Sequence, residues 1–242
     1  MTVASLLDVD PDLGDGLAPG ELEQARRALV AAVVELDPGP WEPSTLELGE
    51  QGALGLLIAE GFVLRDVAVG QSKCAELLGA CDVIRPWQDS GAGGVLATEV
   101  DWRVLTRLRL LVVDRRVMEA MTRWPGVAMA LVGRTVARSQ NLAVALAITS
   151  VRGLELRMLA LLWHLADQFG RVTRDGVVLA LPLTHEVLGR LAGATRPSVS
   201  TALKTLENDG LLSKHAGGGF VLHGDPPEQR LDRLVWPPTA RG

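Results

Sequence analysis

Several residue types are scarce in this chain of 242 residues, and each shortage excludes a class of protein. Cys74 and Cys81 are the only cysteines, so a disulfide framework is excluded and a reducing cytoplasm is the expected compartment. No run of about 20 apolar residues is present for a membrane helix, and the first residues lack the pattern of a signal peptide. The sequence therefore predicts a cytoplasmic protein without a membrane partner.

Motifs of catalysis and metal binding are also missing. The chain has no G-x-S-x-G, Walker loop, H-E-x-x-H or C-x-x-C. Its four histidines are scattered, and His164 lies between Trp163 and Leu165, where a core histidine is the more common interpretation. We therefore expect no enzyme, no metal site and no cofactor.

Basic residues are outnumbered, because the net charge is −5, and this alone argues against a nucleic-acid partner. The distribution is uneven. Residues 1–60 hold 12 acidic and 2 basic side chains, whereas residues 151–223 hold 6 acidic and 8 basic ones. A mildly basic C-terminal part is sufficient for a protein that binds a specific DNA sequence as a dimer.

The most informative segment that is present spans residues 183–212, LTHEVLGRLAGATRPSVSTALKTLENDGLL. Apolar residues recur at helical spacing in both halves, which predicts two short helices. Thr184 and Thr195 are candidate N-caps, Gly193 suits a left-handed residue after the first helix, and Pro197 falls in the first turn of the second. The pair is typical of a helix-turn-helix that binds DNA, although an ordinary helical hairpin fits the same spacing.

The residues after this segment favour the DNA-binding interpretation. Two short apolar runs flank the glycine-rich residues 216–219 and predict a β-hairpin, which in this position would form a wing. The chain has only three lysines, and Lys204 and Lys214 both fall in this candidate DNA face.

Residues 193–196 (GATR) and 207–211 (ENDGL) resemble the helix-turn-helix of the Crp/Fnr superfamily of bacterial transcription regulators. The pattern there is an opening threonine, an apolar pair, a G-x-[ST]-R turn, a hydroxyl-rich second helix and a closing acidic-Gly-Leu. Residues 157–162 resemble the family's helix that leads into the DNA domain. The resemblance is strong over residues 125–223, and over residues 46–114 it rests on the pattern of strands.

This resemblance implies an α+β fold. Its parts are an N-terminal β-roll (a jelly roll like that of cyclic-nucleotide-binding domains), a long dimerisation helix and a C-terminal winged helix-turn-helix. Short apolar runs alternate with glycines between residues 46 and 114, as many short strands would, while residues 21–36 predict one amphipathic helix and residues 1–20 irregular structure. The expected domains are an acidic leader with its helix (1–45), a sensor-like β-roll (46–114), a linker and dimerisation helix (115–150), a winged helix-turn-helix (151–223) and a tail (224–242).

The long helix expected after Pro125 carries an apolar stripe whose spacing alternates between three and four residues. This spacing is typical of a coiled-coil seam, and also of a helix packed on its own β-domain. The resemblance favours a homodimer, which would bind a near-palindromic site. The candidate interface residues are Met129, Val132, Val136, Ser139, Ala143 and Leu146.

In a helix-turn-helix of this kind the second helix enters the major groove. Arg196 is the best candidate for binding a guanine or a nearby phosphate, and Ser198 and Thr201 for bases or phosphates. The best-known relatives carry an acidic residue in place of Pro197 and an arginine in place of Thr201, so their operator cannot be transferred. The candidate DNA-binding residues are Thr184, Thr195, Arg196, Pro197, Ser198, Ser200, Thr201, Lys204, Lys214 and His215.

Relatives that bind cyclic nucleotides carry Gly-Glu, followed by Arg-Ser or Arg-Thr, in the β-roll. Residues 79–87 (GACDVIRPW) occupy this region and lack both pairs, so control by cyclic AMP is not expected. Arg85 remains a candidate for binding an anion, although a lone arginine on a strand more often forms a surface ion pair. Two cysteines are too few for the four-cysteine iron–sulfur cluster of the oxygen sensors.

Double-stranded DNA and a second copy of the chain are thus the expected partners, with RNA polymerase as a further candidate. Two other functions remain open. One is a small-molecule-binding sensor that has lost DNA recognition, and the other is a protein-interaction adaptor that binds through the acidic leader and a polar helix face.

Overall fold

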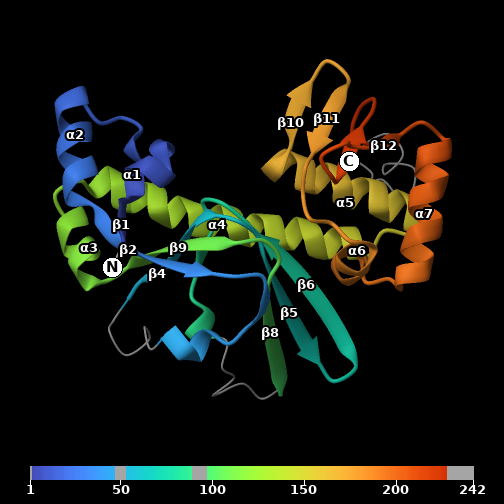
Figure 1. Cartoon of the computed structure of the whole chain (residues 1–242), viewed down its shortest axis with the longest axis horizontal. Coiled ribbons are helices and arrows are strands. Elements are labelled where there is room, and N and C mark those ends of the chain that lie inside the picture. The colour runs from blue at the N-terminus through green and yellow to red at the C-terminus, as the bar shows by residue number, and fades with distance from the viewer. Residues whose placement is uncertain (1, 47–52, 89–96, 228–242) are drawn as a thin grey trace, which may run out of the picture. The chain divides into compact units, whose positions relative to one another are not determined.

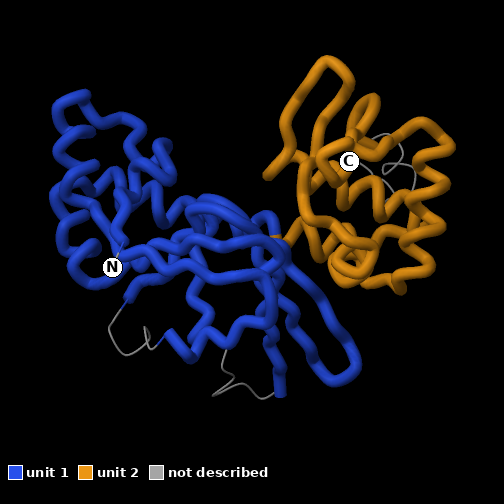
Figure 2. The backbone as a smooth tube through the Cα atoms, in the orientation of Figure 1, with its two compact units in different colours: residues 1–141 blue, residues 142–242 orange. Residues whose placement is uncertain are grey.

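The computed structural model describes residues 2–46, 53–88 and 97–227. The chain divides into two compact units, residues 1–141 and 142–242 (Figure 2). Most of the predicted tail at 224–242 lies outside the described residues.

Unit 1 contains two antiparallel sheets (Figure 1). Their strand orders are β1-β2-β9-β4-β7 and β3-β8-β5-β6. The strands are β1 (Val3–Ser5), β2 (Val30–Leu36), β3 (Gly39–Trp41), β4 (Gly55–Glu60), β5 (Val63–Val69), β6 (Ser72–Leu78), β7 (Val83–Ile84), β8 (Thr98–Val104) and β9 (Leu108–Val113). Its helices are α1 (Leu6–Val9), α2 (Pro19–Ala28) and α3 (Arg115–Met121), with 3-10 turns η1 (Pro11–Gly14), η2 (Pro43–Leu46) and η4 (Pro86–Gln88). Helix α4 (Pro125–Thr149) begins in unit 1 and ends in unit 2.

The five-stranded sheet of unit 1 is buried on both faces. Leu108, Leu110 and Val112 of β9 belong to the core that strands of both sheets share. Leu111 and Val113 belong to a second core, which is formed with α1, α2, α3 and the start of α4. Because successive side chains of a strand point to opposite faces, a strand covered on both sides is a continuous apolar run rather than an alternating one.

The single helix predicted over residues 21–36 is wrong in its second half. Helix α2 ends at Ala28, and residues 30–36 form β2, which pairs with β1 on one side and β9 on the other. Val30, Val33 and Val34 suit a strand because a β-branched side chain packs well on a pleated surface. The partner strand β9 lies more than 70 residues further along the sequence, so local spacing could not reveal the pairing.

The prediction of a separate leader at residues 1–45 is also wrong. Strands β1, β2 and β3 lie within it and are members of the two sheets, and Leu6, Leu7 and Leu13 are buried in the core. The β-domain therefore begins near the start of the chain. The jelly-roll class was nevertheless predicted correctly, because the glycine-punctuated strands between residues 46 and 114 are present.

Unit 2 is a winged helix-turn-helix, as predicted. Its sheet has the order β10-β11-β13-β12, with β12 and β13 forming the wing hairpin. The strand β10 was not predicted. The long helix that ends at Thr149 was predicted correctly. The elements that follow α4 are α5 (Leu154–Phe169), β10 (Arg171–Thr173), β11 (Gly176–Leu179), α6 (His185–Ala192), α7 (Arg196–Asn208), β12 (Leu212–Lys214) and β13 (Phe220–Leu222).

Candidate nucleic-acid interface

Helix α6 and the turn after it are shaped by local chemistry. The hydroxyl oxygen of Thr184 accepts a hydrogen bond from the backbone N–H of Val187 at 3.2 Å, as an N-cap does. Gly193 ends the helix in the left-handed conformation, with φ 63° and ψ 42°. Glycine adopts this conformation without the steric cost of a Cβ, so the direction of the turn follows from the sequence.

The turn also requires Gly189, whose role sequence reasoning missed. The N–H of Ala194 donates to the carbonyl of Gly189 at 2.8 Å. A Cβ at position 189 would lie 2.7 Å from the carbonyl oxygen of Ala194, which is closer than side-chain carbons come to backbone. The small residue inside α6 therefore allows α7 to begin directly against it.

Helix α7 begins with Thr195 at its N-cap position and Pro197 in its first turn. The Thr195 hydroxyl lies 2.9 Å from the Ser198 hydroxyl and makes no hydrogen bond to the backbone of the helix. The buried side of α7 consists of Val199, Ala202, Leu203 and Leu206. Its other side is polar.

Most of the predicted DNA-binding residues of α7 are exposed. Arg196, Lys204 and Thr201 are exposed, and Ser200 is half-buried. Within the described residues neither Arg196 nor Lys204 forms an ion pair, so two cations are open to an anionic partner. The other exposed candidates in the helix-turn-helix are Thr184, Thr195, Pro197 and Ser198.

The hydroxyl groups on α7 are partly engaged by the protein itself. The Thr201 hydroxyl donates to the Pro197 carbonyl at 3.2 Å, and the Ser200 hydroxyl lies 3.0 Å from the Arg196 carbonyl. A hydroxyl has one proton and two lone pairs, so Thr201 in this rotamer can still accept a hydrogen bond. Compared with these hydroxyl groups, the charged side chains of α7 are less engaged by the protein and more available to DNA.

The wing carries the remaining candidates. Lys214 at the end of β12 is exposed, whereas His215 is half-buried, with its Nδ1 3.3 Å from the Gly217 amide and from the Gly218 carbonyl. Gly219 has φ 81°, and a Cβ there would lie 2.1 Å from the Leu179 carbonyl oxygen. The wing therefore packs closely against β11, and the His215 side chain contacts the backbone of its own loop.

Arg157 of α5 has a structural role that the sequence did not reveal, because it appeared there only as part of residues 157–162. Its Nε and Nη2 donate to the Val151 carbonyl at 3.1 and 2.9 Å, and its Nη1 donates to the Ala192 carbonyl at 3.2 Å. Ala192 is the last residue of α6, where carbonyls lack partners within the helix. One guanidinium thus joins the segment before α5 to the end of α6.

The stripe predicted on α4 is exposed. Met129, Val132, Val136 and Leu146 are each between 50% and 68% exposed, which is high for large apolar side chains in a folded chain. Ser139 and Ala143 are exposed as well. The opposite side of the helix packs on unit 1 through buried Val127 and Leu131.

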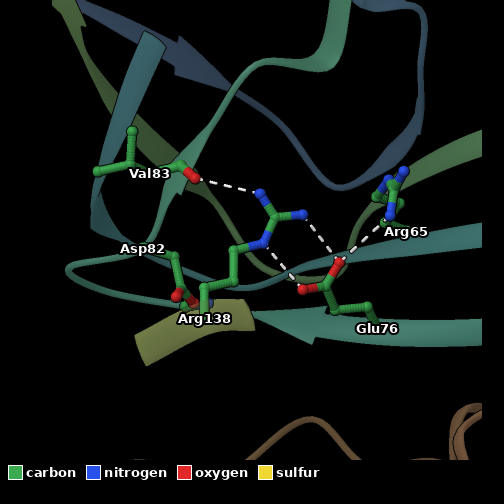
Figure 3. A network of polar contacts seen from close by, with 6 residues as sticks. Arg65, Glu76, Asp82, Val83 and Arg138 are labelled. Carbon is green, nitrogen blue, oxygen red and sulfur yellow. Dashed lines mark hydrogen bonds and ion pairs between the residues drawn. The ribbon is translucent and has the colours of Figure 1, made fainter. Parts of the chain in front are cut away.

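A polar network lies where the β-domain meets α4 (Figure 3). Arg138 of α4 donates to both carboxylate oxygens of Glu76, each at 2.8 Å, and to the Val83 carbonyl at 3.1 Å. Arg65 of β5 approaches the same carboxylate at 3.5 Å. Burial raises the pKa of nearby Asp82 to about 6, although the Gly79 amide and Arg138 partly oppose this.

A second ion pair holds α4 one turn earlier. Arg134 donates from Nε to buried Asp10 at 2.7 Å and from Nη2 to Asp12 at 3.1 Å. Burial and the neighbouring Asp10 carboxylate raise the pKa of the Cys81 thiol to about 11, which leaves it a poor nucleophile. Arg85, the candidate for an anion, is exposed and stacks over Trp87 at 5.9 Å.

Two findings concern metal ions and membranes. Within the described residues, no group of three or more His, Cys, Asp or Glu side chains is arranged to hold a metal ion. None of the helices in those ranges is long and apolar enough to cross a membrane.

The C-terminal part of the sequence matches a known domain family. Residues 156–226 match the Crp-like helix-turn-helix domain. Among curated proteins, none matches the chain.

Solved structures share the fold of nearly the whole chain at low sequence identity. A CooA mutant from Carboxydothermus hydrogenoformans is 18% identical with a TM-score of 0.62, over 96% of this chain and 95% of that one. A cyclic nucleotide-binding domain containing protein from Listeria monocytogenes is 16% identical with a TM-score of 0.64, over 88% and 96%. A CRP-family transcriptional regulator from Thermus thermophilus is 17% identical with a TM-score of 0.53, over 83% and 95%. Together with the domain match, these structures confirm the predicted resemblance to the Crp/Fnr superfamily.

Proposed function

We propose that this chain, which has the fold of the Crp/Fnr regulators and a Crp-like helix-turn-helix domain, is a sequence-specific DNA-binding transcription regulator. The observation that carries the proposal is the exposed polar side of α7, on which Arg196 and Lys204 have no ion-pair partner among the described residues. In this proposal α7 lies in the major groove, where Arg196 binds a guanine edge or a phosphate and Thr201 a base or phosphate. Lys214 at the base of the wing contacts the DNA backbone.

The test is selection of bound fragments from a random DNA pool with purified full-length protein, followed by titration of the enriched sequence at fixed salt. We expect a near-palindromic motif whose half-sites are about one helical turn apart. Binding that is equally tight to every sequence, or no binding at all, would contradict the proposal.

The homodimer is part of the same proposal, and the exposed stripe on α4 supports it. A second copy would cover Met129, Val132 and Val136, and a twofold axis along this seam would pair two recognition helices. Sedimentation of the purified protein tests it, because a monomer at micromolar concentration would contradict it.

We further propose that cyclic AMP does not control this regulator. The Glu76 carboxylate is already bound by Arg138 and approached by Arg65, so a phosphate would have to displace Glu76 to reach these guanidinium groups (Figure 3). Isothermal calorimetry with cyclic AMP should show no binding, and a micromolar dissociation constant would overturn this part of the proposal.

A further inference from the structure

His185, the first residue of α6, forms a side-chain hydrogen bond to α7. His185 is not among the proposed DNA-binding residues. Its Nδ1 lies 2.7 Å from the hydroxyl oxygen of Ser200. That oxygen also lies 3.0 Å from the carbonyl of Arg196, one turn earlier in α7. His185 and Ser200 are both half-buried, so the pair lies at the edge between the two helices.

These two contacts engage the hydroxyl proton of Ser200. A serine hydroxyl has a single proton. If Ser200 donates to the Arg196 carbonyl, the Nδ1–H of His185 donates to Ser200. If Ser200 donates to Nδ1 instead, its hydroxyl no longer bonds the Arg196 carbonyl. In both cases the proton points to the protein, and none is left to donate to the acceptor atoms of a guanine or an adenine.

The helical geometry of α7 agrees with this assignment. At about 100° per residue, Pro197, Thr201 and Lys204 lie within roughly 60° of one another. Their common direction is opposite to the buried residues Val199, Ala202, Leu203 and Leu206. On the same wheel Ser200 lies about 70° from the centre of the exposed face, at its border.

The two helices are therefore constrained at two points. Near the turn, Gly189 admits the carbonyl of Ala194 at a distance that excludes a side chain. At the start of α6, the bond between His185 and Ser200 forms the second constraint. These two contacts act together with the buried residues of α7, Val199, Ala202, Leu203 and Leu206, to set the angle between the two helices.

We propose that His185 is a positioning residue. Its hydrogen bond to Ser200 fixes the orientation of α7 relative to α6, and this orientation decides which side chains of α7 contact the bases. The proposal rests on the DNA-binding function proposed above. Base preference then comes from the row of Pro197, Thr201 and Lys204 together with Arg196 at the start of the helix, and Ser200 donates no hydrogen bond to a base.

The test compares three substitutions of His185 by the base preference of DNA selected from a random pool. Asparagine places a polar atom at the δ position, as Nδ1 of histidine does, so His185→Asn should keep the wild-type preference. His185→Gln moves the polar atoms to the ε position, and His185→Ala removes them. Both should lower the preference for the wild-type motif by roughly 2- to 10-fold, the range that corresponds to one hydrogen bond.

Two further variants make the test specific. Ser200→Ala should shift the preference in the same way as His185→Ala, and the double variant should shift it no further, because both remove the same bond. His223→Ala is the matched control, since it removes a second His–Ser bond, of 2.9 Å to Ser213, at the wing. It should leave the base preference unchanged. Thermal unfolding confirms that each variant is folded.

The outcomes separate the two proposals. If the wild-type protein enriches no motif, the DNA-binding function fails, and this inference with it. If a motif is enriched and His185→Ala and His185→Gln keep it, the positioning role alone is wrong. The role is equally wrong if Ser200→Ala changes the motif while His185→Ala does not, because Ser200 would then read a base directly.

Discussion

Two arginines of the β-domain and two cations of the helix-turn-helix lie in opposite environments. In the β-domain Arg134 and Arg138 each form two hydrogen bonds with a carboxylate that is nearly or fully buried. In the helix-turn-helix, Arg196 and Lys204 are exposed and, within the described residues, have no carboxylate partner. For these four side chains, positive charge stabilises the fold in one unit and is available to a partner in the other.

This difference separates charge that stabilises from charge that recognises. A buried pair is costly to break because the remaining charge is left without solvent or partner. An exposed cation adds little to stability and can be removed without unfolding the chain. Substitutions in the two units should therefore affect different measurements.

The largest effect is expected on α4, where the exposed side chains are apolar rather than charged. Replacing Val132 and Val136 together by glutamate should give a monomer and lower operator affinity by at least about 100-fold, because each half-site is then bound alone. Sedimentation and DNA titration measure the two effects. Ala137→Glu is the control, since Ala137 is exposed on α4 outside the stripe, and a double variant that stays dimeric would contradict the proposed interface.

The next effect is on stability, in the network of the β-domain. Glu76→Ala should lower the free energy of unfolding by about 3 kcal/mol, because Arg138 loses both of its carboxylate contacts. Denaturant unfolding measures it. Glu119→Ala breaks the exposed pair with Arg115 and should change stability by less than about 0.5 kcal/mol. Equal losses in the two variants would remove the distinction between the regions.

A smaller effect is expected on binding alone. Arg196→Ala should lower specific DNA affinity by about 1–3 kcal/mol with little change in the free energy of unfolding, because Arg196 has no ion-pair partner within the described residues to lose. Unchanged operator affinity at fixed salt would show that Arg196 does not contact the DNA.

Lys214→Ala should weaken binding to all DNA sequences alike and reduce the salt slope of binding by about 1.

The smallest effect concerns the pH dependence of the β-domain. The pKa of Asp82 rises from its ordinary 3.8 to about 6, mainly through burial, so folding favours its protonated form. Its contribution to stability is therefore greatest below about pH 4 and is lost as the pH rises through about 6. Asp82→Asn should remove this dependence and stabilise the protein at pH 8 relative to the wild type, while keeping an oxygen for the Gly79 amide.

Wild-type and variant unfolding curves at pH 4 and pH 8 measure the difference. Parallel dependence of the two proteins on pH would show that Asp82 is not the titrating group.

The helix-turn-helix was predictable because its signals are short-range. The cap at Thr184, the left-handed Gly193 and the early Pro197 each act within a few residues. The bond from His185 to Ser200 was not predictable, because nothing in the spacing of 15 residues shows which polar side chains will meet across a helix pair.

The β-domain was predictable in class and not in extent. Glycines between short apolar runs indicated strands, but β2 was hidden in a sequence with helical spacing until β1 and β9 paired with it. The Arg134–Asp10 contact joins residues 124 positions apart. Neither partner of that pair carries a local signal.

The sequence by itself determined the fold class, the long helix and the helix-turn-helix with its turn, because caps, glycine conformations and helical spacing act between near neighbours. Only the tertiary structure decided that residues 30–36 are a strand, which arginines are paired and which are open. Those outcomes depend on contacts between distant segments, where burial and pairing outweigh local preference.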